Sequence, residues 1–431
     1  MFCLGCGEKN PDGARFCRWC GEQLPASSPA APAARAATLP PRRGRGRLVA
    51  CVLGAVAVVG ALALLVVHVF MGGPTSREVS MTNASIGYGC TATVGGIDYY
   101  WDPADRRLMR ADPDDGQSAE VMRLDDDGEY VRRIDAGSDD VFVLVSRYDG
   151  SEPDELRRVS ADGSDVTGIY RAEEDPSGGY GMIRQANEFD GMLFVAVEMR
   201  PNDATGSPAR LEVWRMKPDG GERELLASVE CDPDGLAMGP DSLYYTDGQQ
   251  VFAYEYDDAA PRLLYASAWD YLSPPAPHRG RVYFMESYDK PIDGVTGYRV
   301  TGKLVGRITS VALDGSDVQS FDIPQDSEPL ELIALADGTA YLQMRTAASE
   351  GGTDGVSYGV IAGFSLSDGS LASSVELPPA FGNPRATDAG GHLVVAMMSN
   401  DSVGAAYGAY ALGYDGTVLR TYEGLPADGE A

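Results

Sequence analysis

From residue 85 onward, short β-rich runs alternate with turn residues in a pattern that repeats along the chain. Each unit opens with a run centred on an aromatic or β-branched residue and closes with an alternating strand that ends at a turn. The central position recurs 39 to 58 residues apart, at Tyr99, Phe142, Phe194, Tyr244, Tyr283, Tyr341 and Val394. Because each unit has room for four strands, this repeat predicts an all-β fold, a β-propeller of seven blades, with six or eight as alternatives. We expect the recurring aromatic residues to lie in the core.

The turn that closes each unit is usually Asp-Gly. The aspartates are Asp115, Asp162, Asp219, Asp314, Asp368 and Asp415, and Asp257-Asp258 takes this place in the fourth unit. Asp-Gly between two alternating runs predicts a tight hairpin in which both residues adopt a positive φ.

A long apolar run precedes the repeats, from Leu48 to Met71, and His68 is its one notably polar residue. About 20 apolar residues cross the hydrocarbon region of a bilayer as a helix. Four arginines stand directly before the run, at Arg42, Arg43, Arg45 and Arg47. By the positive-inside rule, we expect a single-pass protein of the cell membrane with a cytosolic N-terminus and an extracytoplasmic C-terminal part.

Two Cys-x-x-Cys pairs open the chain, Cys3 with Cys6 and Cys17 with Cys20. Four thiolates in this spacing predict one tetrahedral, structural Zn²⁺ site within residues 1–24. The stretch resembles the short zinc ribbons at the N-terminus of many bacterial membrane proteins. We expect this ribbon to contact a cytosolic protein rather than nucleic acid.

Composition separates the remaining residues into two linkers and the propeller. Residues 25–47 form a Pro-, Ala- and Arg-rich linker, and residues 72–84 are expected to be a juxtamembrane linker before a propeller at 85–427. The whole chain has 35 basic and 64 acidic residues, but its first 71 residues hold eight basic and three acidic ones. The propeller is therefore strongly acidic, which argues against binding to nucleic acid.

Two segments of the repeats resemble the YWTD signature of low-density-lipoprotein-receptor-type propellers, Tyr244-Tyr245-Thr246-Asp247 and Tyr99-Tyr100-Trp101-Asp102. The layout of the whole chain is similar to a bacterial family of uncharacterised propellers of that type, in which a zinc ribbon and one membrane helix commonly precede the propeller. The resemblance implies the fold and a place in the cell envelope, and it implies no defined activity.

Motifs for catalysis are scarce. Residues 355–359 match the G-x-S-x-G pattern, but a glycine-rich chain produces such a match by accident, and the elbow needs a strand–turn–helix. The chain has three histidines, and its acidic runs lack the glutamate that ends an EF-hand loop. We therefore expect a protein without enzymatic activity.

Four long insertions interrupt the units at one equivalent position, Arg200–Arg210, Glu286–Val305, Arg345–Gly359 and Ser399–Gly408. Equivalent positions in a propeller emerge on one face, and such insertions often mark the binding side, although tolerated surface loops are an equal alternative. The longest insertion supplies the candidate ligand-binding residues Tyr288, Asp289, Asp293 and Tyr298.

The expected function is binding of a peptide, protein or cell-wall component at the cell envelope. The alternatives are a transmembrane sensor that couples occupancy of the propeller to a cytosolic partner, and, third, an enzyme that acts on envelope glycans.

Overall fold

The computed structural model of the chain describes residues 76–86, 89–148, 152–173, 179–201, 208–290, 303–324, 328–347, 356–378, 382–399 and 408–423. The chain divides into two units, Met1–Phe70 and Met71–Ala431. The zinc-ribbon cysteines, the arginine-rich linker and the apolar run lie outside the described residues, so the ribbon and the membrane span stay predictions. None of the helices in the described ranges is long and apolar enough to span a membrane.

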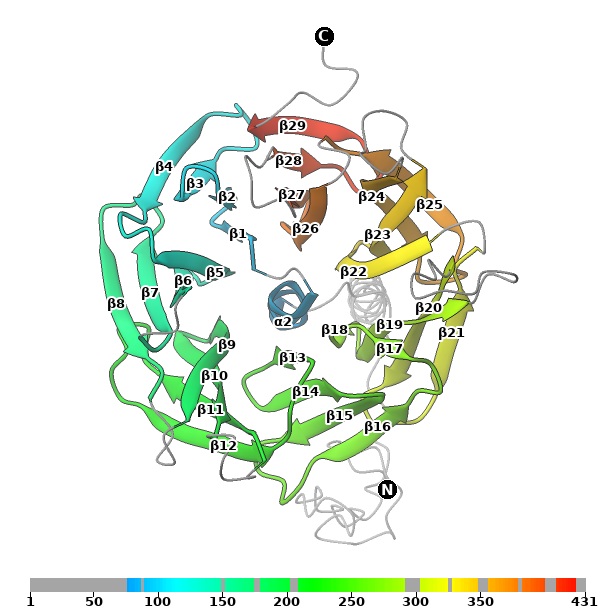
Figure 1. Ribbon diagram of the computed structural model, residues 1–431, viewed down its shortest axis with the longest axis horizontal. Coiled ribbons are helices and arrows are strands. Elements are labelled where there is room, and N and C mark those ends of the chain that lie inside the picture. Colours follow the sequence, from blue (N-terminus) through cyan, green and yellow to red (C-terminus); the bar gives the residue numbers. More distant parts are fainter. Residues whose placement is uncertain are drawn as a thin grey trace, which may run out of the picture. The chain divides into compact units, whose positions relative to one another are not determined.

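Seven antiparallel sheets stand around a central channel, and each is built from consecutive strands (Figure 1). Blade 1 comprises β1 (Thr91–Val94), β2 (Ile97–Asp102), β3 (Arg107–Ala111) and β4 (Ser118–Arg123). Blade 2 comprises β5 (Glu129–Ala136), β6 (Asp140–Arg147), β7 (Glu155–Ser160) and β8 (Val166–Arg171). Blade 3 comprises β9 (Tyr180–Phe189), β10 (Met192–Arg200), β11 (Arg210–Met216) and β12 (Glu224–Glu230). Blade 4 comprises β13 (Gly235–Met238), β14 (Ser242–Asp247), β15 (Gln250–Glu255) and β16 (Arg262–Ala266).

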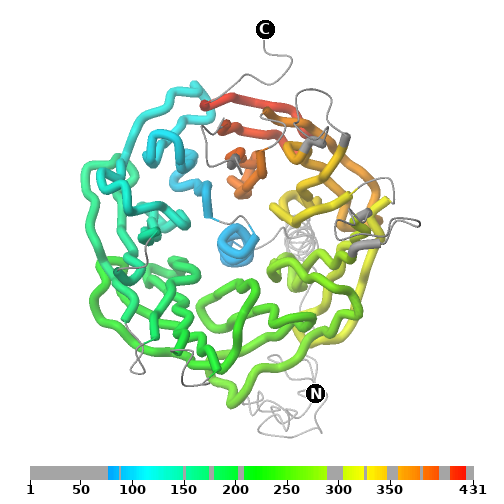
Figure 2. The backbone as a smooth tube through the Cα atoms, viewed as in Figure 1, coloured from blue at the N-terminus to red at the C-terminus, as the bar shows by residue number. Residues whose placement is uncertain are grey.

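The last three blades follow the same plan. Blade 5 has its innermost position divided between two short strands and comprises β17 (Tyr271–Leu272), β18 (Ala276–His278), β19 (Arg281–Lys290), β20 (Lys303–Ala312) and β21 (Val318–Asp322). Blade 6 comprises β22 (Glu328–Ala336), β23 (Thr339–Ala347), β24 (Val356–Ser365) and β25 (Leu371–Glu376). Blade 7 comprises β26 (Gly382–Asp388), β27 (Leu393–Ser399), β28 (Gly408–Leu412) and β29 (Val418–Glu423). The chain passes once around the ring, with each first strand innermost (Figure 2). The prediction of a seven-bladed propeller is confirmed.

The recurring position of each unit lies in the second strand of a blade and is buried. Its side chains are at most 7% exposed, and they are Tyr99, Phe142, Phe194, Tyr244, Tyr283, Tyr341 and Val394. Because both sides of each sheet face a neighbouring blade, these bulky side chains fill the space between sheets. Their assignment to the core is confirmed.

The Asp-Gly pairs form the turn between the third and fourth strands, but their backbone differs from the prediction. Only the glycine has a positive φ, as Gly163 does at 75°, while Asp162 is not among the residues with positive φ. Asp162 instead accepts a hydrogen bond from the amide of Ser164 at 2.9 Å, and the other five Asp-Gly turns repeat this contact two residues on. Such an Asx turn holds the aspartate in a right-handed conformation and leaves the positive φ to glycine alone. The hydrogen bonds from Ser164 and Ser160 lower the pKa of Asp162 to about 2.

A helix, α2 (Ser76–Ile86), lies in the central channel at the middle of the ring (Figure 1). Residues 72–84 were expected to be a linker, whereas the structure makes most of this segment part of the propeller. Glu78 in the first turn complements the positive end of the helix dipole. Met81 and Ile86 are buried, the latter against blades 5 and 6.

Hydrogen bonds attach α2 to three blades. Asn83 donates to the carbonyl of Asp388 in blade 7 at 2.9 Å and accepts from the amide of the same residue at 3.0 Å. Ser85 donates to the carbonyl of Pro275 in blade 5 at 2.6 Å. Asn187 of blade 3 donates to the hydroxyl of Ser80 at 3.1 Å. Because a net hydrogen bond contributes about 1 kcal/mol, these polar contacts help to hold α2 in the channel beside its buried apolar side chains.

The propeller has two faces that differ in their connections. Neighbouring strands alternate in direction, so the turns from first to second strand all lie on one face, which we call the hairpin face; Gly95, Asp190 and Asp241 mark it. The passages from second to third strand, and from one blade to the next, lie on the opposite face. We call this second face the insertion face.

Side chains close the ring between blades 7 and 1. Nε2 of His392 lies 2.7 Å from Oδ2 of Asp98, a fully buried carboxylate, and the hydroxyl of Tyr422 donates to the same oxygen at 2.6 Å. On the outer side, Arg107 and Glu423 form an ion pair at 2.6 Å. Since every blade is made of consecutive strands, this seam rests on side-chain contacts rather than on a shared strand.

The seam predicts a pH dependence of stability. The hydrogen bond to Asp98 raises the pKa of His392, burial opposes the rise, and the charges of Asp98 and Asp388 add to it. A histidine whose folded pKa is raised stabilises the protein fully below its unfolded value, about 6.5, and loses that contribution as the pH rises through the folded value. We therefore expect the gap in unfolding free energy between the wild type and His392→Gln to be larger at about pH 5.5, below the unfolded pKa, than at about pH 9, well above it. Urea unfolding across this range measures the gap, and an equal gap at all pH values would contradict the prediction.

Candidate functional site

The four insertions occupy the same connection in their blades. They join β10 to β11, β19 to β20, β23 to β24 and β27 to β28, which is the passage from second to third strand. All four therefore emerge on the insertion face. Most of their own residues lie outside the described residues, at 202–207, 291–302, 348–355 and 400–407.

The candidate ligand-binding residues fall partly within the structure. Tyr288 lies near the end of β19, and its ring meets that of Trp269 edge-on, with centroids 4.9 Å apart. The backbone of Asp289 in β19 lies opposite that of Leu304 in β20 in the antiparallel sheet. Asp293 and Tyr298 lie outside the described residues. The assignment of these four residues to a binding site stays a prediction.

A buried carboxylate supports this part of blade 5. Glu286 is fully buried, and its oxygens accept hydrogen bonds from Nε of Arg307 at 2.6 Å and from the hydroxyl of Thr309 at 2.5 Å. The hydroxyls of Ser267 and Tyr265 donate to it as well. Burial by itself would raise the pKa of Glu286, but the hydrogen bonds from Arg307, Ser267 and Thr309 outweigh it and hold the pKa below its usual value. The side chain is therefore an anion at neutral pH, with its donors fixed around it.

Arg307 connects this carboxylate to the aromatic rings. Its guanidinium lies over the ring of Trp269, 4.4 Å from the centroid, while its Nε stays on Glu286. A guanidinium over an aromatic face gains a cation–π contact of about 0.5–1 kcal/mol at exposed sites. We call Glu286, Arg307, Trp269 and Tyr288 the blade-5 cluster. It holds two rings and a cation in fixed positions at the base of the longest insertion.

Three exposed tyrosines on the same face were missed by the sequence analysis. Tyr148 follows β6 and is 74% exposed, Tyr180 begins β9 and is 57% exposed, and Tyr271 begins β17 and is 42% exposed. The ring of Tyr148 stacks on Tyr130 with centroids 4.4 Å apart. The other exposed large hydrophobic residues in the described ranges are aliphatic and lie in fourth strands or in the turn after β20: Val166, Leu225, Leu263, Leu313, Val318, Leu371 and Leu419. No signal in the sequence separates these tyrosines from the tyrosines of the core.

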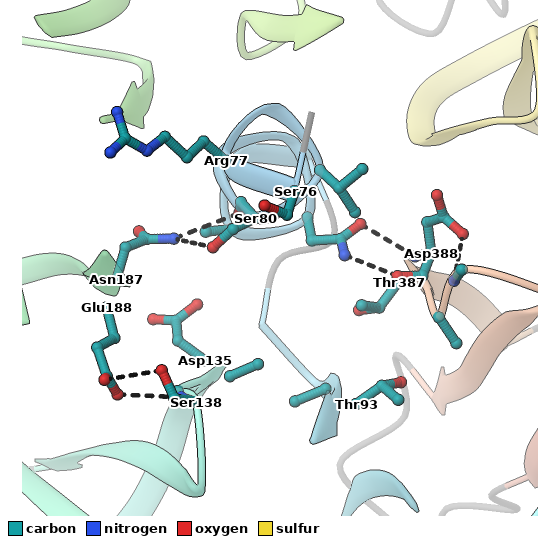
Figure 3. A pocket seen from close by; sticks show the side chains of 18 of the residues that line it. Ser76, Arg77, Ser80, Thr93, Asp135, Ser138, Asn187, Glu188, Thr387 and Asp388 are labelled. Atoms are coloured by element: carbon teal, nitrogen blue, oxygen red, sulfur yellow. Dashed lines mark hydrogen bonds between the residues drawn. The ribbon is translucent and has the colours of Figure 1, made fainter. Parts of the chain in front are cut away.

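A cavity of about 610 Å³ lies beside α2 in the central channel (Figure 3). Its walls come from α2 and from the innermost strands and hairpins of blades 1, 2, 3 and 7. The helix itself packs most extensively on β18 and β13 of blades 5 and 4, and it also contacts β9, β22 and β26. The lining includes the hairpin residues Gly95, Ser138, Asp190 and Gly390, which place the cavity toward the hairpin face.

Carboxylates dominate the charged groups of this channel cavity. Four of its lining residues are acidic, namely Asp135, Glu188, Asp190 and Asp388, and one is basic, Arg77. Arg77 pairs with Asp190, and Arg133 from behind the wall pairs with Asp135 at 2.9 Å. Burial raises the pKa of Asp135, although the charge of Arg133 opposes the rise.

Metal chemistry finds no support in the part of the chain that the structure describes. Within it, no three His, Cys, Asp or Glu side chains come together in a group that could hold a metal ion. Cys3, Cys6, Cys17 and Cys20 lie outside it, so the Zn²⁺ site stays a prediction.

The G-x-S-x-G segment does not form a nucleophile elbow where the structure describes it. Ser357 lies inside β24 and pairs with Thr346 of β23. The elbow requires a sharp turn from a strand into a helix, and β24 instead leads to β25 in the same sheet.

Comparison with other proteins assigns the chain to no family. No family model matches the chain, and no curated protein matches it. Solved structures with some similarity in their backbone include a nidogen/laminin complex. It is 15% identical over 54% of this chain and 78% of that one, with a TM-score of 0.36. They also include puromycin hydrolase, at 12% identity over 83% and 56% of the two chains with a TM-score of 0.47. Oligogalacturonate lyase in complex with manganese is similar at 10% identity over 70% and 92% of the chains, with a TM-score of 0.40.

These neighbours correct one expectation. The sequence analysis expected a protein without enzymatic activity, and that conclusion is wrong, because several propellers similar to this chain are enzymes. At such low identity the likeness concerns the fold alone, and a fold does not show an activity. The chain is a seven-bladed β-propeller, and the comparisons assign it to no family.

Proposed function

We propose that this protein is a membrane-anchored component of the cell envelope whose propeller binds a protein or peptide through its insertion face. The observation that carries the proposal is the separation of exposed side chains by type. Within the described residues, the exposed tyrosines lie on the insertion face and the exposed aliphatic residues lie elsewhere, mostly on the outer strands. The zinc ribbon and the single membrane span belong to the same proposal, on the basis of the sequence.

The residue types on the insertion face are those that contribute most to protein interfaces. Tyrosine, tryptophan and arginine are enriched among the few residues that dominate binding energy. Tyrosine offers a large contact area with few rotatable bonds, so little entropy is lost when a partner covers it. The exposed Tyr148, Tyr180 and Tyr271 and the blade-5 cluster supply all three residue types on one face.

The blade-5 cluster also has the rigidity that a recognition surface needs. Arg307 is held by the buried Glu286, and its guanidinium in turn covers the ring of Trp269. Side chains fixed before binding pay less entropy when the partner arrives.

The proposal predicts that the tyrosines are needed for capture of a partner. In the triple variant Tyr148→Ser, Tyr180→Ser, Tyr271→Ser, partner recovered after crosslinking in living cells should fall at least about 30-fold, since truncating one dominant interface residue costs about 2 kcal/mol or more. The stability of the propeller should not change, because all three side chains are exposed. Quantitative mass spectrometry of crosslinked material isolated with the full chain measures the loss.

The matched control removes the same number of exposed hydrophobic side chains from the outer strands. Leu225→Ser, Leu263→Ser, Leu371→Ser together change residues that are 44%, 48% and 58% exposed. Recovery of the partner should stay at the wild-type level in this control. Equal loss in both triple variants, or unchanged recovery in the tyrosine variant, would contradict the proposal.

A further inference from the structure

A second cavity lies in the central channel toward the insertion face, and it shares no described lining residue with the cavity in Figure 3. Its volume is about 300 Å³, at the lower end of the range of small-molecule sites. Asp234 and Pro274 line it, just before the innermost strands β13 and β18, and these strands begin on the insertion face. Ser85, near the end of α2, lines it as well. The exposed tyrosines and the blade-5 cluster lie outside its described lining, so the cavity is distinct from the partner surface proposed above.

Guanidinium groups dominate the charged side chains of this second cavity. Arg132 and Arg133 reach it from β5 of blade 2 and Arg184 from β9 of blade 3, whereas Asp234 is the one acidic residue of its described lining. Arg133 also donates from Nη1 to the carbonyl of Arg184 at 3.2 Å, which links the two strands at this wall. The propeller is otherwise strongly acidic, so three arginines together in its channel depart from its overall composition. We call this site the arginine cavity.

A carboxylate behind the wall holds each of the three guanidinium groups. The pairs are Arg132 with Asp154 at 3.0 Å, Arg133 with Asp135 at 2.9 Å, and Arg184 with Glu198. The three carboxylates are at most 12% exposed, and none of them belongs to the described lining of the cavity. They fix the arginines before any ligand arrives, which lowers the entropy cost of binding.

Two of the arginines keep N–H donors that no described protein group uses. A guanidinium group has five such donors. Arg132 is 27% exposed and donates to Asp154 through Nη1 alone, so its Nε and Nη2 reach no acceptor in the described part of the chain. Arg184 is 19% exposed and donates through Nη1 and Nη2, and its Nε has no acceptor among the same residues. All three nitrogens retain accessible surface, so a ligand can reach them.

We propose that the arginine cavity binds an oxyanion, a carboxylate or a phosphate group, at the insertion-face end of the channel. A guanidinium group is a planar fork of donors without an acceptor, and it matches the paired oxygens of these two groups. The carboxyl end of α2, near Ser85, opposes an anion with a partial charge of only about half a unit. The fixed donors of Arg132 and Arg184 supply the opposite sign from two strands.

The test is calorimetric titration of the purified full-length protein with a matched pair of peptides and with inorganic phosphate. The peptides are N-acetylated trialanine with a free carboxylate and the same peptide with a carboxamide end. We expect the carboxylate peptide to bind at one site per chain and at least about 10-fold more tightly than the carboxamide. That factor equals about 1.4 kcal/mol, and a hydrogen bond to a charged group contributes at least as much. The affinity should also fall as salt is added.

Two substitutions locate the site. In Arg132→Gln, Asp154 keeps its hydrogen bonds from the hydroxyl of Ser146 at 2.6 Å and the amide of Ile183 at 3.0 Å. In Arg184→Gln, Glu198 keeps its ion pair with Arg200. Each variant should keep the wild-type unfolding midpoint within a few degrees and lose at least about 10-fold in affinity for the anion that binds.

The matched control removes one arginine from the same face. Arg171 ends β8, is 57% exposed and lies outside the described lining of the cavity. Arg171→Gln lowers the charge of the protein by the same amount and should bind the probes like the wild type.

The outcomes decide the proposal in either direction. Binding of the carboxylate peptide or of phosphate, lost in both cavity variants and kept in the control, supports it, and the probe that binds identifies the source of the oxyanion. Absence of binding by every probe, equal affinity of the two peptides without binding of phosphate, or unchanged affinity in a folded Arg132→Gln variant overturns it. Capture of a partner by the exposed tyrosines is measured separately, so either proposal can fail while the other stands.

Discussion

Replacing Glu286 with alanine is expected to lower the free energy of unfolding by about 3–5 kcal/mol, the usual cost of removing one partner from a buried ion pair. The change would leave the guanidinium of Arg307 and the hydroxyls of Thr309, Ser267 and Tyr265 without their acceptor. Each buried donor left unsatisfied costs about 1–3 kcal/mol. Urea unfolding of the full chain, followed by tryptophan fluorescence, measures the loss.

The same substitution should also weaken capture of the partner, because Arg307 would no longer be held over Trp269. Glu224→Ala is the matched control. That carboxylate is 56% exposed and pairs with Arg215 on the surface, so its loss should cost less than about 1 kcal/mol. If the two alanine variants unfold at the same urea concentration, Glu286 does not support the blade-5 cluster as described.

Replacing Cys17 with serine is expected to reduce the zinc content of the purified chain from one ion to none. Structural Zn²⁺ in small ribbons binds with about 10–16 kcal/mol at pH 7, and four thiolates are needed for this affinity. Residues 1–24 have almost no apolar side chains to form a core, so we expect them to lose their fold with the metal. Elemental analysis by mass spectrometry measures the metal content.

A second cysteine substitution serves as the control. Cys231 lies in the core between blades 3 and 4, and Cys231→Ser should leave the zinc content unchanged. Zinc near zero in the wild type, or an equal loss in both variants, would contradict the ribbon.

The repeats could be predicted from the sequence because each unit gives the same local signal. Buried positions such as Phe142 and Tyr341 recur once in each unit, and every Asp-Gly turn closes a hairpin between neighbouring strands. Summed over seven units, such weak signals predict one architecture. The φ of the aspartate was predicted wrongly, because its side chain bonds to the backbone and stabilises another turn.

The helix in the channel could not be predicted in the same way. Residues 76–86 contain few large apolar side chains, and α2 is buried because a ring of seven blades surrounds it. Its position depends on contacts such as Asn83 with Asp388, which are 305 residues apart in the sequence. The channel cavity has the same origin, since its walls come from α2 and four separate blades.

The insertion face was predicted in part. The four insertions share one connection, so their common face followed from the repeat. Tyr148, Tyr180 and Tyr271 were not recognised, because a tyrosine at the end of a strand has the same sequence signature whether it is buried or exposed. Exposure depends on the neighbouring blade, which the sequence of one strand does not specify.

The most direct test of the central claim is to find which face of the propeller touches the partner in living cells. A photo-reactive amino acid placed at position 148 or 271 reports on the insertion face, at 241 on the hairpin face, and at 371 on the outer strands. All four side chains are exposed, so each probe is accessible. We expect one and the same partner to be crosslinked from Tyr148 and Tyr271, and not from Asp241 or Leu371. Crosslinking of that partner from Asp241 or Leu371, with none from the two tyrosine positions, would contradict the account.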